Sequence, residues 1–341
     1  MKPFVAFALF LSSFACTTEP RGTDPALTRI DRSRVDEGAR IVEELLADDE
    51  IDRAVSGAEA LVRRDPNAAV ARTAAAKAHA AAAVRDLDPG AYADAIREAT
   101  LACETSPDDA ASWYVRGKLQ FDRRHYSKSL DDFAHALEVD PRHVDALRMT
   151  AWAERALGRP KAERLAWREL VAAHPGDARG HVRLGQCLQT SAIDEEIAEA
   201  PPVFERAVTL DPNDDLALHE LARVHAAEGR PEEAERLLRR AVAATAGRPI
   251  READALFNLG AAVLAQGRAD EARRLFERCL AANPDDHRAI GNLGFLLLEA
   301  GELEEARRRL RDAADRENNA AVRRRIEQLL DETAPEPEQG V

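Results

Sequence analysis

The chain repeats itself at a spacing of about 34 residues, and this period limits the possible folds more than any other property of the sequence. Four pairs of identical residues near the C-terminal end lie one period apart: Leu259 and Leu293, Gly260 and Gly294, Gly267 and Gly301, and Ala272 and Ala306. Each period contains two segments with the apolar spacing of amphipathic helices, separated by a glycine-containing turn. No single helical pair can bury its apolar face, so neighbouring pairs are expected to stack.

The same template recurs upstream and divides most of the chain into units. In the segment 110–143, the residues Trp113, Gly117, Tyr126 and Phe133 stand at the expected offsets. The predicted units are 35–68, 76–109, 110–143, 144–177, 178–214, 215–252, 253–286 and 287–320. The fourth unit lacks one residue, whereas the fifth and sixth carry a few extra residues.

Glycines recur at two places in the units, and each place has its own physical reason. One set is expected where the two helices of a unit cross closely, opposite small residues of the second helix such as Ala200 and Ala272: Gly117, Gly185, Gly260 and Gly294. The other set is expected to end the first helix, where a positive φ is often needed: Gly158, Gly229, Gly267 and Gly301.

The order W-x₂-L-G-x₂-Y, then A-x₃-F, then alanine and proline, at this period, resembles the tetratricopeptide repeat (TPR). The resemblance covers about residues 35–320. It implies an all-α fold, namely an α-solenoid of tandem helix-turn-helix repeats forming a right-handed superhelix, and a function in binding other proteins. Residues 321–331 are predicted to form a capping helix with a polar outer face, and the tail 332–341 is predicted to be disordered.

Residues 1–15 are predicted to be a signal peptide. The apolar run from Phe4 to Phe14 is shorter than the about 20 residues that span a bilayer. Ser13 and Ala15 precede Cys16 at the −3 and −1 positions, which resembles the signal of a bacterial lipoprotein. That resemblance implies a lipid on Cys16, a flexible tether over 16–34, and attachment to a membrane of the cell envelope, with the outer membrane facing the periplasm as the expected place. The family usually has leucine at −3, so secretion as a soluble periplasmic protein and an uncleaved anchor remain alternatives.

Composition and motifs argue against several function classes. The formal net charge of −14 disfavours broad nucleic-acid binding, because an acidic chain repels a phosphate backbone. Cysteines 103, 187 and 279 fall at core positions of predicted helices, and no CxxC motif is present. The sequence has no catalytic, phosphate-binding or metal-binding signature that we recognise. We therefore predict a protein that is not an enzyme and has no cofactor and no metal site.

The family resemblance also implies where a partner binds, because in TPR arrays positions 2, 5, 9 and 12 of the first helix line the concave groove. The candidate groove residues are Tyr114, Lys118, Arg148, Trp152, Arg155, Gln186, Gln189, His219 and Arg223. This set is cationic, polar and partly aromatic on an acidic chain. We expect it to bind an acidic segment or a C-terminal carboxylate of a protein partner. In the alternative interpretation, Arg148 and Arg155 pair with nearby acidic residues and Trp152 is a packing residue.

Three functions remain open at this point. The first is a scaffold or adaptor of the cell envelope that binds a protein or peptide segment in the groove. The second is a module for a small molecule or a glycan, with Trp152 as a stacking platform. The third is a scaffold that assembles with copies of itself.

Overall fold

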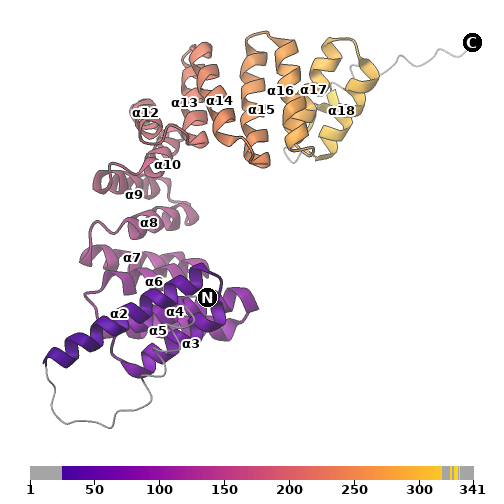
Figure 1. The fold of residues 1–341 in the computed structure, drawn as a ribbon. Coiled ribbons are helices and arrows are strands. Elements are labelled where there is room, and N and C mark those ends of the chain that lie inside the picture. Colours follow the sequence, from indigo (N-terminus) through magenta and orange to yellow (C-terminus); the bar gives the residue numbers. More distant parts are fainter. Residues whose placement is uncertain (1–24, 317–322, 325, 329, 331–341) are drawn as a thin grey trace, which may run out of the picture. The chain divides into compact units, whose positions relative to one another are not determined.

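In the described parts of the chain, every element of the computed structural model is an α-helix (Figure 1). The model describes residues 25–316, 323–324, 326–328 and 330, and it divides into two compact units, 1–146 and 147–341. The helices are α2 (Pro25–Ala47), α3 (Ile51–Arg64), α4 (Ala69–Asp86), α5 (Pro89–Thr105), α6 (Ala110–Asp122), α7 (Tyr126–Val139), α8 (Val144–Ala156), α9 (Pro160–Ala173), α10 (Ala178–Gln189), α11 (Asp194–Ala198), α12 (Ala200–Leu210), α13 (Asp215–Ala227), α14 (Pro231–Thr245), α15 (Pro249–Ala265), α16 (Ala269–Ala282), α17 (His287–Glu299) and α18 (Leu303–Arg316). None of the helices in these described ranges is long and apolar enough to cross a membrane.

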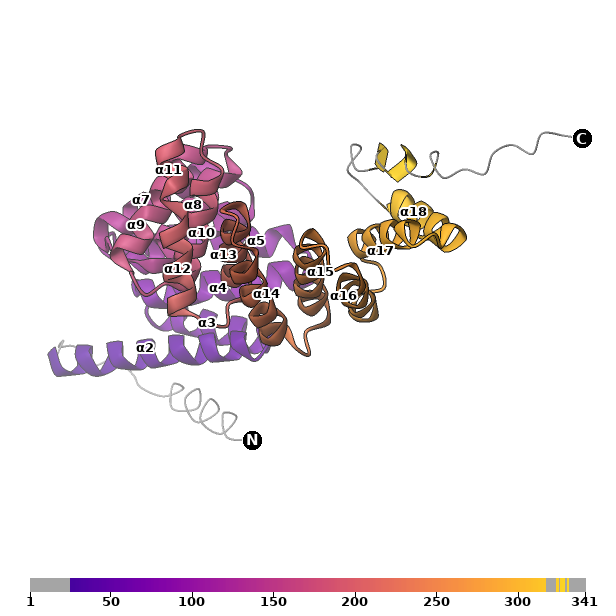
Figure 2. The ribbon, with the colours of Figure 1, turned by 90° about the horizontal axis from the view of Figure 1, so that it is seen from above.

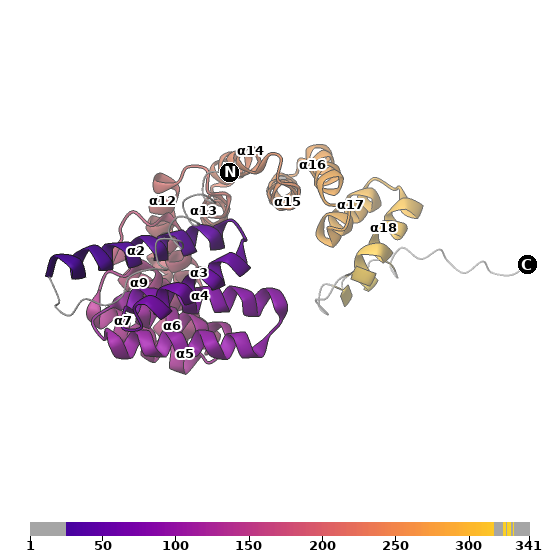
Figure 3. The ribbon, with the colours of Figure 1, turned by 60° about the horizontal axis from the view of Figure 1, so that its bottom comes forward.

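The first unit is built from α2 to α7 and the start of α8. Its core is rich in alanine: α4 alone buries alanines 69, 71, 74, 75, 76, 78 and 83. Helix α2 packs against α3 and α4, and α4 in turn contacts α5 and α6 (Figure 3). A buried hydroxyl pair, Thr73 with Ser112 at 3.1 Å, joins α4 to α6. The alanines allow close helix approach because they occupy little volume between the backbones.

The second unit continues with the rest of α8 and the helices up to α18. Helices α15, α16, α17 and α18 lie side by side in chain order (Figures 1 and 2). First helices of successive pairs also touch, as α10 touches α13 and α13 touches α15. Large buried side chains such as Trp167, Phe204 and Phe276 fill the core. This contact pattern, in which each pair packs on the next, is that of an α-solenoid.

Three of the four crossing glycines are packed against aromatic rings, and the fourth, Gly294, is packed against Leu310. A Cβ atom on Gly185 would lie 2.5 Å from Phe204, and one on Gly117 would lie 2.6 Å from Phe133. Gly260 has the same relation to Phe276. The close approach of the two helices is therefore confirmed at these glycines, and the atoms nearest to the added Cβ include those of the phenylalanine rings. The ring is the larger group, and it needs the volume that a missing Cβ leaves.

The turn glycines adopt the expected backbone conformation. Gly158, Gly229, Gly267 and Gly301 have φ between +69° and +80°. In these pairs the first helix therefore ends in a left-handed residue, which glycine adopts without a steric penalty.

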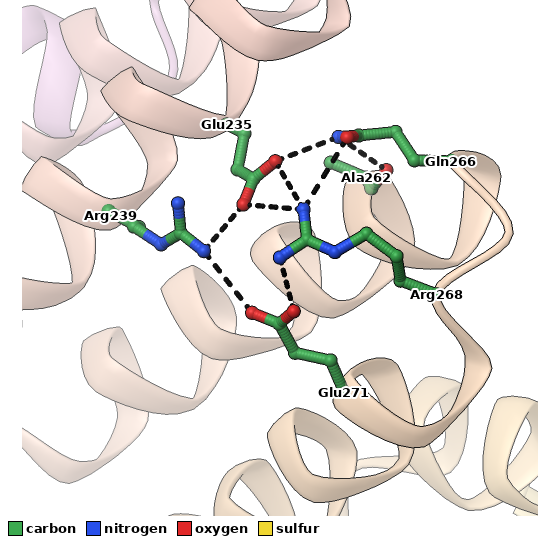
Figure 4. A network of polar contacts seen from close by, with 6 residues as sticks. All are labelled: Glu235, Arg239, Ala262, Gln266, Arg268 and Glu271. Carbon is green, nitrogen blue, oxygen red and sulfur yellow. Dashed lines mark hydrogen bonds and ion pairs between the residues drawn. The ribbon is translucent and has the colours of Figure 1, made fainter.

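A network of charged groups joins consecutive pairs of the second unit (Figure 4). Its centre is Glu235 on α14, which is only 4% exposed. The Arg268 guanidinium, from the turn before α16, donates to both carboxylate oxygens of Glu235 at 2.9 and 2.8 Å, and Gln266 Nε2 donates at 3.1 Å. Arg239 bridges Glu235 and Glu271 at 2.5 and 3.2 Å. The network thus fixes the second helix of one pair against the second helix of the next.

The structure differs from the sequence expectations at both ends of the array. Helix α2 begins at Pro25, so residues 25–34 are helical, whereas the sequence analysis placed them in a flexible tether. Proline suits a first helical position because its missing N–H would have no helical partner there. The predicted signal peptide, Cys16 and the tail 332–341 lie outside the described residues. Of the predicted cap 321–331, the described residues are helical, and Ile326 packs in a cluster with Ile290 and Leu310.

Candidate functional site

The second unit contains a pocket of about 500 Å³ that is lined by five arginines and two tryptophans. The lining residues come from α8, α9 and α10, from the turn between α12 and α13 with the start of α13, and from the turn before α15 with the start of α15. The basic and aromatic lining residues are Arg148, Trp152, Trp167, Arg179, Arg183, Arg248 and Arg251. We call this site the arginine pocket.

Trp152 organises the α8 side of the arginine pocket. Its indole meets the buried Trp167 edge-on, with ring centroids 5.7 Å apart and planes at 88°. The Arg183 guanidinium lies over the Trp152 ring at 4.9 Å, and that of Arg155 at 5.6 Å. Stacking on an aromatic ring holds a guanidinium in place while its N–H groups remain able to donate. Trp152 therefore packs against a buried side chain, as the alternative interpretation of the sequence expects. It also holds two guanidiniums over its ring.

The arginines of the pocket differ in how far they are already paired. Arg148 donates to Asp177 Oδ2 at 2.9 Å, and Arg251 pairs with Asp215 at 3.2 Å. Arg183 donates to the Gln186 side-chain oxygen at 2.9 Å. Arg179 is exposed and makes no ion pair or hydrogen bond within the described part of the chain. The pocket thus holds at least one cation whose donors are not used internally.

The acidic residues of the pocket are engaged in backbone contacts. Asp214 caps α13 by accepting from Leu216 N at 2.9 Å and Ala217 N at 3.1 Å. Asp211 accepts from Asn213 N at 3.0 Å in the preceding turn. Their carboxylates are therefore partly satisfied by the turn itself, and five guanidiniums against three carboxylates leave the lining net positive. Such a surface suits an anionic group with planar geometry, because a guanidinium can bind a carboxylate through two parallel hydrogen bonds.

Two of the predicted groove residues belong to the first unit. Tyr114 stacks near His143 at 5.0 Å, and Lys118 pairs with Asp122 at 2.8 Å. Both line a different pocket, formed by α3, α4 and α6. Their surroundings are more apolar than those of the arginine pocket, with Val115 and Leu119 beside them.

Three further predicted residues have polar partners within the chain and do not line the arginine pocket. Gln186 Nε2 donates to Glu220 Oε1 at 2.8 Å, and Arg223 donates to Glu220 Oε2 at 2.7 Å. Arg155 reaches Glu163 at 3.7 Å. Glu220 is 6% exposed, so Arg223 balances the charge of a buried carboxylate and Gln186 donates a further hydrogen bond to it. Gln189, on the last turn of α10, is half-buried and does not line the pocket.

His219 lies in an adjoining pocket of about 360 Å³, which shares Asp215, Leu216 and Arg251 with the arginine pocket. Burial lowers the pKa of the His219 imidazole, and the nearby carboxylate of Glu220 opposes this effect. Its Nδ1 atom is buried and has no hydrogen-bond partner among the described residues. His219 is therefore expected to be neutral near pH 7 and adds no charge to the groove.

The described cysteines have the character of core residues. Burial raises the pKa of Cys103 to about 11 and the pKa values of Cys187 and Cys279 to about 12. A thiol with so high a pKa is a poor nucleophile at neutral pH. Within the described ranges, no group of three histidine, cysteine or acidic residues could hold a metal ion.

Several residues of the arginine pocket were not predicted from the positional rule, which assigns positions 2, 5, 9 and 12 of each first helix to the groove. Arg179 occupies position 2 of its unit, so the rule itself could have found it. Arg183 stands one residue after position 5, and stacking on Trp152 directs it into the pocket. Arg248 and Arg251 come from residues that the repeat period treats as extra, where the sequence has no template to place a side chain.

Comparisons with known proteins identify the family. Three family models, each described as tetratricopeptide repeat, match residues 114–178, 215–285 and 263–329, which together cover just over half of the chain. A TPR repeat-containing protein of Rhizobium etli is 35% identical over 71 residues, which are 21% of this chain and 35% of that protein. The chain thus spans about a third of the length of this curated relative. The chain is a tetratricopeptide-repeat protein. Its family consists generally of non-catalytic scaffolds for protein interactions.

Solved structures show the same fold. The C-terminal part of a TPR repeat-containing protein from Cytophaga hutchinsonii matches 75% of this chain and 99% of its own with a TM-score of 0.57 and 15% identity. The APC/C hetero-tetramer Cut9-Hcn1 matches 86% of this chain and 55% of its own with a TM-score of 0.54 and 15% identity. Pseudomonas aeruginosa pilF matches 64% of this chain and 97% of its own with a TM-score of 0.53 and 15% identity. At this identity the likeness shows the fold alone, and the predicted all-α solenoid is confirmed.

Proposed function

We propose that this TPR protein is an interaction scaffold of the bacterial cell envelope that binds an acidic segment or a C-terminal carboxylate of a protein partner in the arginine pocket. The observation that carries the proposal is that five guanidiniums and Trp152 line one pocket on a chain with a net charge of −14. The lining is positively charged although the protein as a whole is acidic. Such a local reversal of charge favours the binding of an anionic group.

The geometry of the pocket supports recognition of carboxylates. Arg183 is held by its stacking on Trp152, and Arg179 has no internal partner in the described structure. Arg148 is paired with Asp177 but is still about one third exposed. Surface ion pairs of this kind contribute little, about 0–1 kcal/mol, so a ligand carboxylate can compete for the guanidinium. Arginine and tryptophan are also frequent hot-spot residues of protein interfaces.

The location in the cell envelope is the second part of the proposal. It rests on the sequence of residues 1–16, with Cys16 as the lipidated residue and a membrane as the consequence. Binding of a glycan or small molecule on Trp152 is less well supported, because the guanidiniums of Arg155 and Arg183 already lie over its ring.

A peptide-display experiment tests the proposed ligand chemistry. Peptides would be selected on the natural protein from a random library with free C-termini, and their affinities would be measured by fluorescence anisotropy. We expect enrichment of aspartate, glutamate or a free terminal carboxylate. We also expect binding to weaken by about 30-fold or more in the variant Arg179→Ala with Arg183→Ala, as truncation of hot spots costs about 2 kcal/mol.

The matched control is Arg236→Ala with Arg308→Ala, which removes two arginines that are 71% and 76% exposed and lie outside the pocket. This control should retain the natural affinity. Selected peptides without carboxylates, or equal binding to the pocket variant, would contradict the proposal.

A further inference from the structure

The turn between α4 and α5 differs from the glycine turns of the array. Leu87 has a φ of +53° and stands two residues before the start of α5, just as the glycines that follow α8, α13, α15 and α17 stand two residues before the next helix. Leucine is strained in this left-handed conformation, because its Cβ atom comes close to a carbonyl oxygen. Its side chain is also 87% exposed. A large apolar residue that is unfavourable to the fold in both respects favours a contact with another molecule.

The helical hairpin that carries Leu87 is longer than the next one. Helices α4 and α5 have 18 and 17 residues, whereas α6 and α7 have 13 and 14, and the turn between α4 and α5 projects from the first unit (Figure 3). Val84, one helical turn before Leu87, is 71% exposed. We call residues 84–88 the leucine tip.

The leucine tip is acidic. Arg85 pairs with Asp52 at 2.8 Å and with Asp86 at 2.7 Å. Asp88 caps α5, and Asp49 lines the same pocket as Val84 and Arg85. Four aspartates therefore stand against one arginine at this end of the hairpin, which leaves a local charge of −3 whatever the pairing.

An exposed aliphatic side chain with basic neighbours lies at the edge of the arginine pocket. Helix α15 has 17 residues, whereas α13 and α17 have 13 each, and it begins with an additional turn at Pro249. This turn presents Ile250, which is 72% exposed and stands in the sequence between Arg248 and Arg251. Both arginines line the arginine pocket. We call residues 248–252 the α15 extension, and the repeat template has no equivalent of it.

We propose that the leucine tip of one molecule binds at the α15 extension of a second copy, with Leu87 and Val84 against Ile250 and the tip carboxylates at the arginine pocket. The inference rests on the anion-binding role proposed for that pocket, and it names an occupant. Charge complementarity selects this pairing, because the tip is acidic whereas the pocket lining has five guanidiniums against three carboxylates. Contact between two tips is disfavoured, since like charges repel.

The proposed contact is heterologous, because the two surfaces are different. Each associated pair retains one free tip and one free α15 extension, so association continues beyond the dimer unless it closes a ring. The tip also occupies the arginine pocket, so a carboxylate-bearing partner competes with self-association.

Sedimentation velocity of the full chain over a range of concentrations measures this association. The tip variant is Leu87→Gly, which removes the apolar group and relieves the strain of the turn. The seat variant is Arg248→Ala with Ile250→Ser. We expect each variant alone to associate at least about tenfold more weakly than the natural chain. An equimolar mixture should form dimers and nothing larger, because each pair then contains one intact tip and one intact seat.

The control is Arg124→Gly, because Arg124 has a φ of +61° at the same place in the next pair and belongs to neither surface. This variant should associate as the natural chain does. The inference is overturned if the natural chain stays monomeric, if either variant associates as strongly as the natural chain, or if the mixture forms no dimers while circular dichroism shows the natural helix content.

A short polyglutamate peptide separates this inference from the proposed function. Its binding to the natural chain and to Leu87→Gly is measured by fluorescence anisotropy. We expect it to bind both proteins and to dissociate the assembly of the natural chain. Peptide binding by a natural chain that stays monomeric would overturn the self-association and leave the proposed function intact. Dimers in the mixture without any peptide binding would support the contact and contradict the ligand chemistry proposed for the arginine pocket.

Discussion

At Gly185 the backbone of α10 comes so close to the ring of Phe204 that a side chain has no room. A Cβ atom would lie 2.5 Å from Cε1 and 2.6 Å from Cζ of this ring. Phe204 is fully buried, so its ring cannot move without displacing closely packed neighbours. The sequence pattern identified the small residue correctly, but it did not reveal that an aromatic ring is what requires it. Residue spacing shows which positions face each other and does not show which atoms touch.

Gly185→Ala is therefore expected to destabilise the protein by about 1–3 kcal/mol, the usual cost of overpacking a core. The free energy of unfolding in urea gives the measurement. A second substitution, Phe204→Leu, should recover part of the loss in the Gly185→Ala background. Gly176→Ala is the control, because a Cβ atom there meets nothing within 4 Å. Equal stability of Gly185→Ala and Gly176→Ala would show that the contact is not as tight as described.

At the scale of helices, the repeat period predicted the helical pairs better than the segments and contacts that connect one pair to the next. Hydrophobic spacing and turn glycines mark a helix locally, since they depend on residues a few positions apart. The short helix α11 and the early start of α2 at Pro25 follow no repeated template. The network around Glu235 was also not predicted, because its partners come from two different pairs (Figure 4).

The Glu235 network should make the second unit sensitive to acid. Burial tends to raise the pKa of Glu235, but the hydrogen bonds from Arg268 and Gln266 outweigh burial and hold this pKa below its usual value. The folded state therefore prefers the carboxylate more than the unfolded state does. The contribution of the Glu235 carboxylate to the free energy of unfolding is fully present above the pKa of the unfolded state, about 4.3. It is lost as the pH falls through the lower pKa of the folded state.

Glu235→Gln is expected to cost about 1–3 kcal/mol at pH 7, because it leaves the donors of two arginines without their buried carboxylate. Unfolding in urea between pH 7 and pH 3 would measure the difference from the natural protein, which should shrink below about pH 4. Glu233→Gln, at an exposed pair with Arg236, is the control and should change stability by less than about 1 kcal/mol. A difference that stays constant over this pH range would argue against a role of the ionised carboxylate.

At the scale of the whole molecule, the two units contain pockets of different chemistry. The second unit contains the arginine pocket, whereas the first contains the more apolar pocket formed by α3, α4 and α6. The positional rule found Arg148 and Trp152 in one and Tyr114 and Lys118 in the other. It could not separate them, since a linear template assigns every first helix to a single groove. The separation depends on neighbouring residues such as Ala80 and Arg183, whose effect is spatial.

Recovery of a cross-linked partner from the membranes of the source organism would test directly whether the arginine pocket binds a protein. The natural protein would be compared with Arg148→Ala, Arg179→Ala and Arg183→Ala combined, after circular dichroism has shown that the variant is folded. We expect a protein partner to cross-link to the natural chain and its recovery to fall by at least about tenfold with the variant. Recovery of the same partner in equal amount with both proteins would contradict the role of the arginine pocket, and the absence of any protein partner would contradict the scaffold itself.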